Sequence, residues 1–167
     1  MNRLILFRHG KAEHDSASGR DFDRRLAPRG VEESADMSRS LADLGLAPEV
    51  VLVSPAARTR ETWLAAAPAF PAAQARFDDD LYHAEPATLR RLIAEAAGVS
   101  GAVMVVGHNP GLQDLALALL KEGRADPSIV SRAQAHFPTA SAAVFLIDGE
   151  GRPAADGLFF PRDRRSF

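Results

Sequence analysis

Cysteine is absent from the 167-residue sequence, aromatic residues make up only 7% of it, and no apolar run is long. The absence of cysteine excludes disulfide scaffolds, cysteine-ligated zinc, iron–sulfur clusters and thiol nucleophiles, and it fits a reducing compartment. A membrane helix needs about 18 consecutive apolar residues, so none is expected. The first apolar run, residues 4–7, ends at Arg8 and is too short for the core of a signal peptide. We therefore expect a cytoplasmic protein with no membrane partner.

Lysine is also scarce, because the 20 basic residues are 18 arginines and only Lys11 and Lys121. The formal net charge of −2 gives no basis for nonspecific binding of nucleic acid. Since arginine is so common here, a single arginine is informative only where its position at a strand end gives it a physical role. The basic tail Arg162–Phe167 is expected to be a solvated chain end, with partner docking as the alternative.

The rest of the composition, 46% hydrophobic and 25% charged, is that of an ordinary globular protein. A chain of this length can bury about two thirds of the surface that it exposes when unfolded. That is enough for a core without disulfides or a structural metal. We expect residues 1–167 to form one domain.

Short apolar runs alternate with longer segments of helical pattern, which is typical of α/β proteins. Strands are predicted at residues 4–7, 50–53, 102–106, 143–147 and 158–160. Runs such as Val103–Val106 are apolar throughout, as in strands that are covered by helices on both faces. The predicted fold is a three-layer α/β/α sandwich whose central sheet is mostly parallel.

Helix signals fall between the predicted strands. Apolar and small residues after Pro28 mark one helical face that ends at Gly45, and a further helix is predicted over 86–97. Ser54-Pro55 and Asn109-Pro110 each place a capping side chain before a proline, which predicts a helix directly after the second and third strands. The polar segment 13–25 reads as a long loop over one edge of the sheet, and loops of that length are often functional.

Polar residues directly follow three of the predicted strands. The three exits read Arg8-His9-Gly10, Ser54-Pro55-Ala56-Ala57-Arg58 and Gly107-His108-Asn109-Pro110-Gly111. Ligands of open α/β sheets bind outside the carboxyl ends of the strands. If the strands are neighbours, two histidines and two arginines surround a volume that fits one tetrahedral anion.

Such a group suits phosphoryl transfer from a monoester or a phosphoramidate. Two guanidinium groups can bind the nonbridging oxygens, and a neutral imidazole can attack to form a covalent phosphohistidine. A second histidine, protonated beside the dianion, would act as a further donor. Gly10 would let the backbone pass close to the anion, and the helix that opens at Asn109-Pro110 would add free N–H groups. On the alternative interpretation His9 is a polar residue at a sheet edge, and His108 and Asn109 serve only as cap residues.

These motifs resemble the histidine phosphatase superfamily, which has the phosphoglycerate-mutase-like fold. The stretch Asp23-Arg24-Arg25-Leu26 ahead of Gly30, together with the compact spacing, is similar to the SixA-type phosphohistidine phosphatases, which have no large cap domain. The resemblance implies that His9 is the phosphorylated nucleophile and that Arg8, Arg58 and His108 surround the phosphate. It also implies, less specifically, that Arg24 lies near the pocket, whereas a solvated surface position is the alternative.

Two positions depart from the family pattern. Glu61 stands where a glutamine is expected, and we expect it on a helix away from the phosphate. Glu85 is the one carboxylate available as the general acid, although it could simply favour the start of a helix. SixA-type proteins can lack a clear acid, and a protonated phosphoimidazole needs less proton donation than an alkoxide. The other histidines are expected at the surface or in loops, with two of them, His14 and His83, nearer the pocket mouth.

The sequence therefore predicts a phosphatase with no metal and no cofactor, acting through a phosphohistidine intermediate. Its expected substrate is phosphohistidine in a signalling or phosphotransfer protein. Three alternatives remain open. They are a small-molecule or phosphoserine/threonine monoesterase of the same superfamily, a catalytically silent phosphoprotein-binding module, and a metal-dependent hydrolase, for which no ligand spacing is present.

Overall fold

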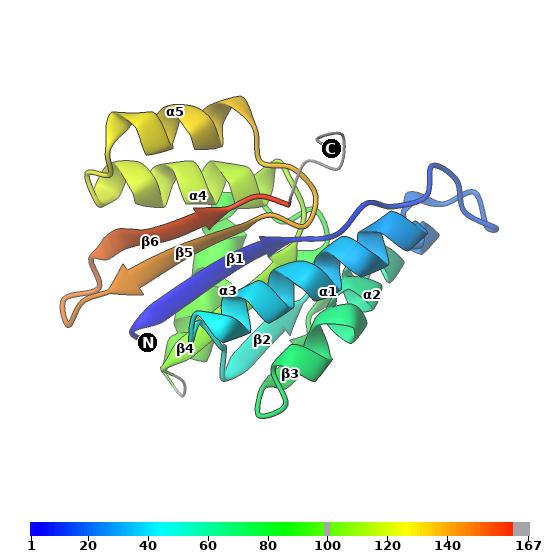
Figure 1. The fold of residues 1–167 in the computed structure, drawn as a ribbon, viewed down its shortest axis with the longest axis horizontal. Coiled ribbons are helices and arrows are strands. Elements are labelled where there is room, and N and C mark those ends of the chain that lie inside the picture. The colour runs from blue at the N-terminus through cyan, green and yellow to red at the C-terminus, as the bar shows by residue number, and fades with distance from the viewer. Residues whose placement is uncertain (99–100, 162–167) are drawn as a thin grey trace.

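A computed structural model describes residues 1–98 and 101–161 (Figure 1). The tail Arg162–Phe167, predicted to be a solvated end, lies outside the described residues. Six strands form one sheet in the order β3-β2-β4-β1-β5-β6. The strands are β1 (Arg3–Arg8), β2 (Val50–Val53), β3 (Gln74–Phe77), β4 (Ala102–Gly107), β5 (Ala142–Ile147) and β6 (Pro153–Phe159).

The first four strands run in parallel, so their carboxyl ends meet at one rim of the sheet. β5 and β6 extend the sheet as antiparallel strands beyond β1. In the register of the central pair, Phe7 lies opposite Val106 and Arg8 opposite Gly107. The residues that follow, His9 and His108, consequently leave the sheet side by side.

Helices cover both faces of the sheet, which confirms the predicted three-layer α/β fold (Figure 1). The helices are α1 (Pro28–Asp43), α2 (Ala57–Ala66), α3 (Pro86–Ala97), α4 (Gly111–Glu122) and α5 (Pro127–Ala135). Three short 3-10 helices are η1 (Asp21–Asp23), η2 (Ala67–Ala69) and η3 (Asp79–Leu81). Ile5 and Phe7 of β1 pack in the core under α1 and α2, whereas Leu4 and Leu6 pack under α3, α4 and α5. Because both faces are buried, the strand reads as a continuous apolar run.

The helix boundaries follow the sequence signals, but two of the predicted caps are wrong. α1 ends just before Gly45, whose φ of +75° suits the glycine that was expected there. α2 and α4 begin after the second and third predicted strands, yet neither has a side-chain cap hydrogen bond. Ser54 instead contacts His108, and Asn109 donates to the carbonyl of Phe137. Both side chains bind partners across the rim, and Ser54 Oγ also accepts a long hydrogen bond, 3.5 Å, from the N–H of Ala56 just ahead of α2.

One strand and one α-helix were not predicted, and two segments differ from expectation. β3 and α5 are additional, and β6 begins at Pro153, five residues ahead of its predicted start at Leu158. The loop 13–25 contains η1, and an isolated bridge pairs Ala12 with Leu26 at its base. The loop extends beyond the carboxyl end of β1 rather than lying over an edge of the sheet (Figure 1). Within residues 1–98 and 101–161, no helix has the length and apolar character needed to cross a membrane.

Candidate active site

His9 follows β1 directly and lies beside the exit of β4. Its backbone N–H donates to the carbonyl of Gly107 at 3.1 Å, which extends the strand pairing by one residue. His9 is 7% exposed, and its Nδ1 lies 2.7 Å from the carbonyl oxygen of Gly10. Because a carbonyl can only accept, Nδ1 carries the proton and Nε2 keeps its lone pair. Burial, reinforced by nearby arginine charges, lowers the pKa of His9 to about 3, so the ring is neutral near physiological pH.

His108 follows β4, and its ring centroid lies 5.4 Å from that of His9. Nε2 of His108 is 2.7 Å from Ser54 Oγ at the exit of β2, and Nδ1 is buried without a hydrogen-bond partner. Burial, together with neighbouring His9 and Arg58, lowers the pKa of His108 to about 2. Without a bound anion, burial among cationic groups therefore keeps the ring neutral, and protonation of His108 beside a phosphate dianion stays a prediction. A neutral ring still offers one N–H donor.

Arg8 and Arg58 reach this region from the end of β1 and from the start of α2. Arg58 is 4% exposed, and its Nη1 and Nη2 donate to the backbone oxygen and to Oδ2 of Asp21, at 2.9 and 3.0 Å. Arg8 donates from Nη1 to the carbonyl of Phe137 at 3.0 Å, while its Nε is buried without a partner. Burial and the charge of Arg58 lower the pKa of Arg8. The structure thus brings four predicted residues together, which we call the histidine cluster: Arg8, His9, Arg58 and His108.

Packing against α1 requires a glycine at position 10, and the close approach to an anion that the sequence suggested stays a prediction. A Cβ at Gly10 would lie 2.5 Å from the carbonyl oxygen of Gly30 and 2.6 Å from Ser34 Oγ, both on α1. Its N–H donates to Thr62 Oγ1 at 3.0 Å. Gly10 therefore allows the chain after His9 to pack against α1, and its N–H is already bound rather than free for an anion.

Asn109 connects the exit of β4 to a distant loop. Its Nδ2 donates to the carbonyl of Phe137 at 3.0 Å, which is the same oxygen that Arg8 uses, and its Oδ1 is buried without a partner. The adjacent Asn109–Pro110 peptide bond is cis. A Cβ on Gly111 would lie 1.9 Å from the carbonyl oxygen of Ala84, so this glycine lets the segment before α3 approach the start of α4.

A second group of side chains, Asp21, Tyr82 and His83, lies beside the histidine cluster, and we call it the outer cluster. The Tyr82 hydroxyl donates to Asp21 Oδ2 at 2.6 Å, and His83 Nε2 lies 3.4 Å from the same oxygen. The ring centroids of Tyr82 and His83 are 5.6 and 5.7 Å from that of His108. Sequence reasoning placed His83 near the mouth but missed Asp21 and Tyr82. The available signal was that Asp21 lies in the unusually long polar loop.

Arg24 belongs to the same neighbourhood as the outer cluster. Its Nη1 donates to Asp21 Oδ1 at 2.9 Å, and its Nε donates to the carbonyl of Glu13 at 2.9 Å. The charge of Arg24 contributes to the lowered pKa of His9. The structure therefore places Arg24 near the histidine cluster, held by Asp21, and its binding of substrate stays a prediction.

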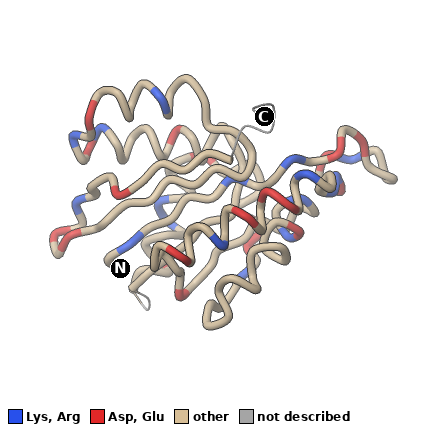
Figure 2. The backbone as a smooth tube through the Cα atoms, viewed as in Figure 1, with Lys and Arg blue, Asp and Glu red and all other residues tan. Residues whose placement is uncertain are grey.

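Glu61, which replaces the expected glutamine, anchors the end of the loop. One of its carboxylate oxygens accepts from Nε and Nη2 of Arg25 at 3.0 and 2.8 Å, and the other accepts from the Leu26 backbone N–H at 2.8 Å. Acidic and basic positions lie close together along this loop, at the right of Figure 2. Glu61 therefore ties the loop to α2.

Glu85, the candidate general acid, is exposed at the position before α3. Among the described residues, it makes no hydrogen bond or ion pair with either cluster, and it does not cap the helix with its side chain. The structure does not bring Glu85 to the histidines. His14 is likewise exposed, and within the described residues it makes no hydrogen bond or ion pair with either cluster.

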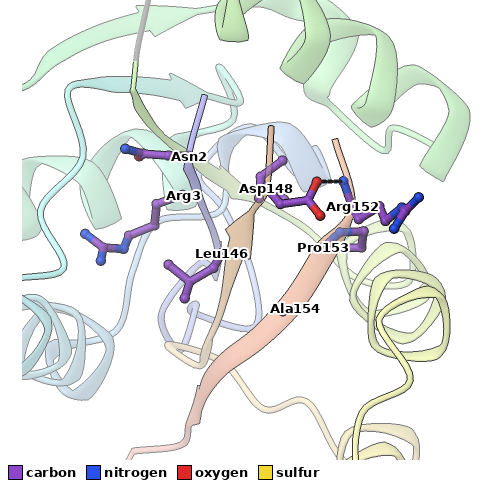
Figure 3. A pocket seen from close by; sticks show the side chains of 8 residues that line it. Asn2, Arg3, Leu146, Asp148, Arg152, Pro153 and Ala154 are labelled. Atoms are coloured by element: carbon purple, nitrogen blue, oxygen red, sulfur yellow. Dashed lines mark hydrogen bonds between the residues drawn. The ribbon is translucent and has the colours of Figure 1, made fainter. Parts of the chain in front are cut away.

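A hollow of about 370 Å³ lies at the opposite end of β1, where Asn2, Arg3, Asp148 and Arg152 are among its lining residues (Figure 3). The Arg152 N–H donates to Asp148 Oδ1 at 2.9 Å in its wall. No histidine lines it, so it is separate from the histidine cluster. Over the described residues, no group of three or more His, Asp or Glu side chains is arranged to hold a metal ion.

Comparison with known proteins agrees with this geometry. The model of the histidine phosphatase superfamily (branch 1) matches residues 4–85. An uncharacterized protein of Mycobacterium tuberculosis is 32% identical over 161 residues, which cover 93% of this chain and 99% of that protein. The structure of SixA from Agrobacterium tumefaciens, a candidate phosphohistidine phosphatase, has a TM-score of 0.84 and 31% identity, covering 96% of this chain and 98% of that one. A tungstate complex of the protein histidine phosphatase SixA shares the fold, with a TM-score of 0.76, 24% identity and coverage of 95% and 97%.

The family model covers the exits of β1 and β2, and the likeness to SixA extends through the exit of β4 to the end of the sheet. The chain belongs to the histidine phosphatase superfamily and is a phosphatase.

Proposed function

We propose that this phosphatase transfers the phosphoryl group of its substrate to His9, without a metal ion or other cofactor, and that it acts on phosphohistidine in a signalling or phosphotransfer protein. The observation that carries the proposal is the 2.7 Å hydrogen bond from Nδ1 of His9 to the Gly10 carbonyl. It leaves Nε2 with its lone pair, and the pKa of about 3 keeps the ring unprotonated. A neutral imidazole held in this way is a competent nucleophile.

The reaction would proceed by two displacements. In the first, Nε2 of His9 attacks phosphorus, and the bond to the leaving nitrogen breaks with its electron pair going to the departing imidazole. In the second, water attacks the phosphorylated His9, and the pair of the P–N bond returns to Nε2. Dividing the transfer in this way replaces one difficult step by two easier ones.

The arginines supply the positive charge that such a transfer needs. Arg58 has five N–H donors, and its two hydrogen bonds to Asp21 leave three for a phosphoryl group. Arg8 adds an Nε that has no partner, and His108 adds an Nδ1 that has none. Donors fixed before the reaction stabilise the charge of the transition state, which is a role that divalent cations fill in other phosphoryl-transfer enzymes.

The choice of phosphohistidine rests on the leaving group. A protonated phosphoimidazole departs as neutral imidazole and needs less proton donation than an alkoxide. Glu85, the expected acid, is exposed and does not contact the histidine cluster. The 31% identity with SixA from Agrobacterium tumefaciens, a candidate phosphohistidine phosphatase, supports the same substrate class.

The test compares wild type with His9→Ala in EDTA, using a histidine-phosphorylated phosphotransfer protein and p-nitrophenyl phosphate. We expect wild type to remain active in EDTA and to prefer the phosphoprotein, and we expect His9→Ala to lose about 10³-fold or more on both substrates. His14→Ala, a change at an exposed histidine, is the matched control. Preference for small esters would transfer the assignment to the monoesterase class, and loss of activity in EDTA would exclude the metal-free mechanism.

A further inference from the structure

The Asp21 carboxylate, carried by η1, is the meeting point of the outer cluster. Oδ1 accepts from Arg24, while Oδ2 accepts from the Tyr82 hydroxyl at 2.6 Å and from Arg58 at 3.0 Å. The hydrogen bond from Tyr82, followed by those from the arginines, holds the pKa of Asp21 well below its ordinary range. Asp21 is therefore a permanent negative charge between Arg58 and His83.

His83 completes this arrangement on the solvent side. Its Nε2 is 3.4 Å from Asp21 Oδ2, a distance that makes an ion pair when the ring is protonated. The ring packs against Tyr82, with centroids 4.1 Å apart, and its side chain is 56% exposed. Among the described residues, Nδ1 has no hydrogen-bond partner. His83 thus has one nitrogen beside a carboxylate and another that is free to exchange protons.

We propose that His83, positioned by Asp21, is the acid–base group of the phosphatase reaction. This inference rests on the proposed phosphorylation of His9. Histidine can both give and take a proton, and a carboxylate beside one ring nitrogen orients the ring. His83 takes the part for which the sequence had suggested Glu85.

The proton balance closes over the two displacements. When the Nε2–P bond forms at His9, the leaving atom keeps the electron pair of its broken bond. A protonated phosphoimidazole then departs as neutral imidazole without a further proton, whereas an ester oxygen takes a proton from protonated His83. When water attacks phosphorus, neutral His83 takes a proton from that water as the P–N bond to His9 breaks. The cycle ends with phosphate released, His9 neutral and one proton on His83, which replaces the proton given to an ester oxygen or, after turnover of a phosphohistidine, passes to solvent.

The other two candidates for the acid–base group, Tyr82 and Glu85, are less well placed. Burial and the bond to Asp21 raise the pKa of Tyr82, so its hydroxyl keeps its proton near neutral pH. Glu85 is exposed and, in the described part of the chain, makes no hydrogen bond or ion pair with either cluster. His83 alone combines a free nitrogen, a ring contact with His108 and a fixed carboxylate partner.

The test separates formation of the phosphoenzyme from its breakdown, using p-nitrophenyl phosphate in rapid-mixing experiments on the full chain. p-Nitrophenolate departs without a proton, so His83→Asn should phosphorylate His9 at a rate within about threefold of wild type. Breakdown needs a base and should slow by about 100-fold. The variant should therefore show a burst of about one p-nitrophenolate per active site followed by slow turnover, and the burst itself shows an intact site. Asparagine tolerates the φ of +55° at this position.

Four further measurements decide between a chemical and a structural role. Added imidazole should restore phosphoenzyme breakdown in His83→Asn, and Asp21→Asn should slow breakdown by about 10-fold. His14→Asn, an exposed histidine of the same loop as Asp21, should leave both steps unchanged. Breakdown at the wild-type rate in His83→Asn, or accumulation of phosphoenzyme in Glu85→Gln instead, would overturn the inference while leaving the His9 mechanism intact. Turnover by wild type without phosphorylation of His9 would overturn both.

Discussion

The histidine cluster and the outer cluster are neighbours, but different parts of the fold hold them. His9 and His108 directly follow two paired central strands, and both are buried. Asp21 and His83 lie outside the regular strands and the longer helices, and their side chains are 43% and 56% exposed. The positions of the proposed nucleophile His9 and of His108 are thus set by strand register, whereas those of the proposed acid–base group His83 and of Asp21 are set by loops and a short 3-10 helix. This division matches the general pattern in which a rigid scaffold presents variable loops that carry specificity.

Arginine substitutions should give the largest difference in activity between the histidine cluster and the outer cluster. We expect Arg58→Ala to lower kcat/KM by about 10³-fold, because it removes preorganised donors to the phosphoryl group. Arg24→Ala, at the edge of the outer cluster, should cost only about 10-fold, since this guanidinium contacts Asp21 and not the histidines. Arg58→Lys keeps the charge without the fork of donors and should be intermediate. Equal losses in the two alanine variants would contradict the division, and steady-state kinetics on one substrate decides it.

The pH dependence of stability should report the buried histidines separately from the outer carboxylate. The folded-state pKa values of His9 and His108 are about 3 and about 2, below the ordinary value of 6.5, so the unfolded chain binds protons first as the pH falls. The free energy of unfolding should therefore decrease from about pH 6.5 downward, by up to about 1.4 kcal/mol per pH unit for each histidine. Asp21 has a lowered pKa, and its stabilising contribution is lost only below its ordinary value of 3.8.

Urea unfolding between pH 5 and pH 7 therefore measures the contribution of the buried histidines without that of Asp21, because this range lies near the ordinary pKa of histidine, 6.5, and above that of aspartate, 3.8. We expect His108→Asn to show a flatter profile than wild type, and His14→Asn to follow the wild-type profile. An unchanged slope in His108→Asn would mean that the ring is protonated in the folded protein.

The sequence predicts the histidine cluster well because the signals for these residues are local. An apolar run followed at once by Arg8-His9 or by His108 identifies both the strand and the polar exit, and the parallel register then brings the exits together. β3 escaped prediction because Gln74–Phe77 is a mostly exposed edge strand without an apolar run. α5 had a usable signal in Asp126 before Pro127, since Asp126 does accept from the Ser128 N–H.

The outer cluster depends on contacts between segments that are distant in sequence. Asp21 binds Arg58 and Tyr82, which lie 37 and 61 positions away, and no local pattern predicts such a contact. Ser54 and Asn109 also show that local sequence rules fail where distant contacts decide the position of a side chain. Local rules assign them to helix caps, whereas tertiary partners take both side chains.

The substitution Gly10→Ala should show how tightly the chain after His9 packs against α1. Gly10→Ala places Cβ within 2.6 Å of two atoms of α1, one of which is the backbone oxygen of Gly30. We expect a loss of about 1–3 kcal/mol in the free energy of unfolding, together with reduced activity because His9 is adjacent. Gly149→Ala is the matched control, because a Cβ there has nothing within 4 Å. Similar urea midpoints for the two variants would show that α1 yields without cost.

The smallest effect is expected from a change at Glu61, which ties the end of the loop 13–25 to α2. Glu61→Gln keeps the shape of the side chain and can still accept from the Leu26 N–H, but it weakens the contact with Arg25, whose side chain is 77% exposed. An exposed ion pair contributes about 0–1 kcal/mol, so the urea midpoint should hardly change. Because the loop carries Asp21 and Arg24, we expect KM to rise about two- to threefold with kcat nearly unchanged. A change in kcat larger than that in KM would show that the loop orders the histidine cluster itself, and the two regions would then act as one.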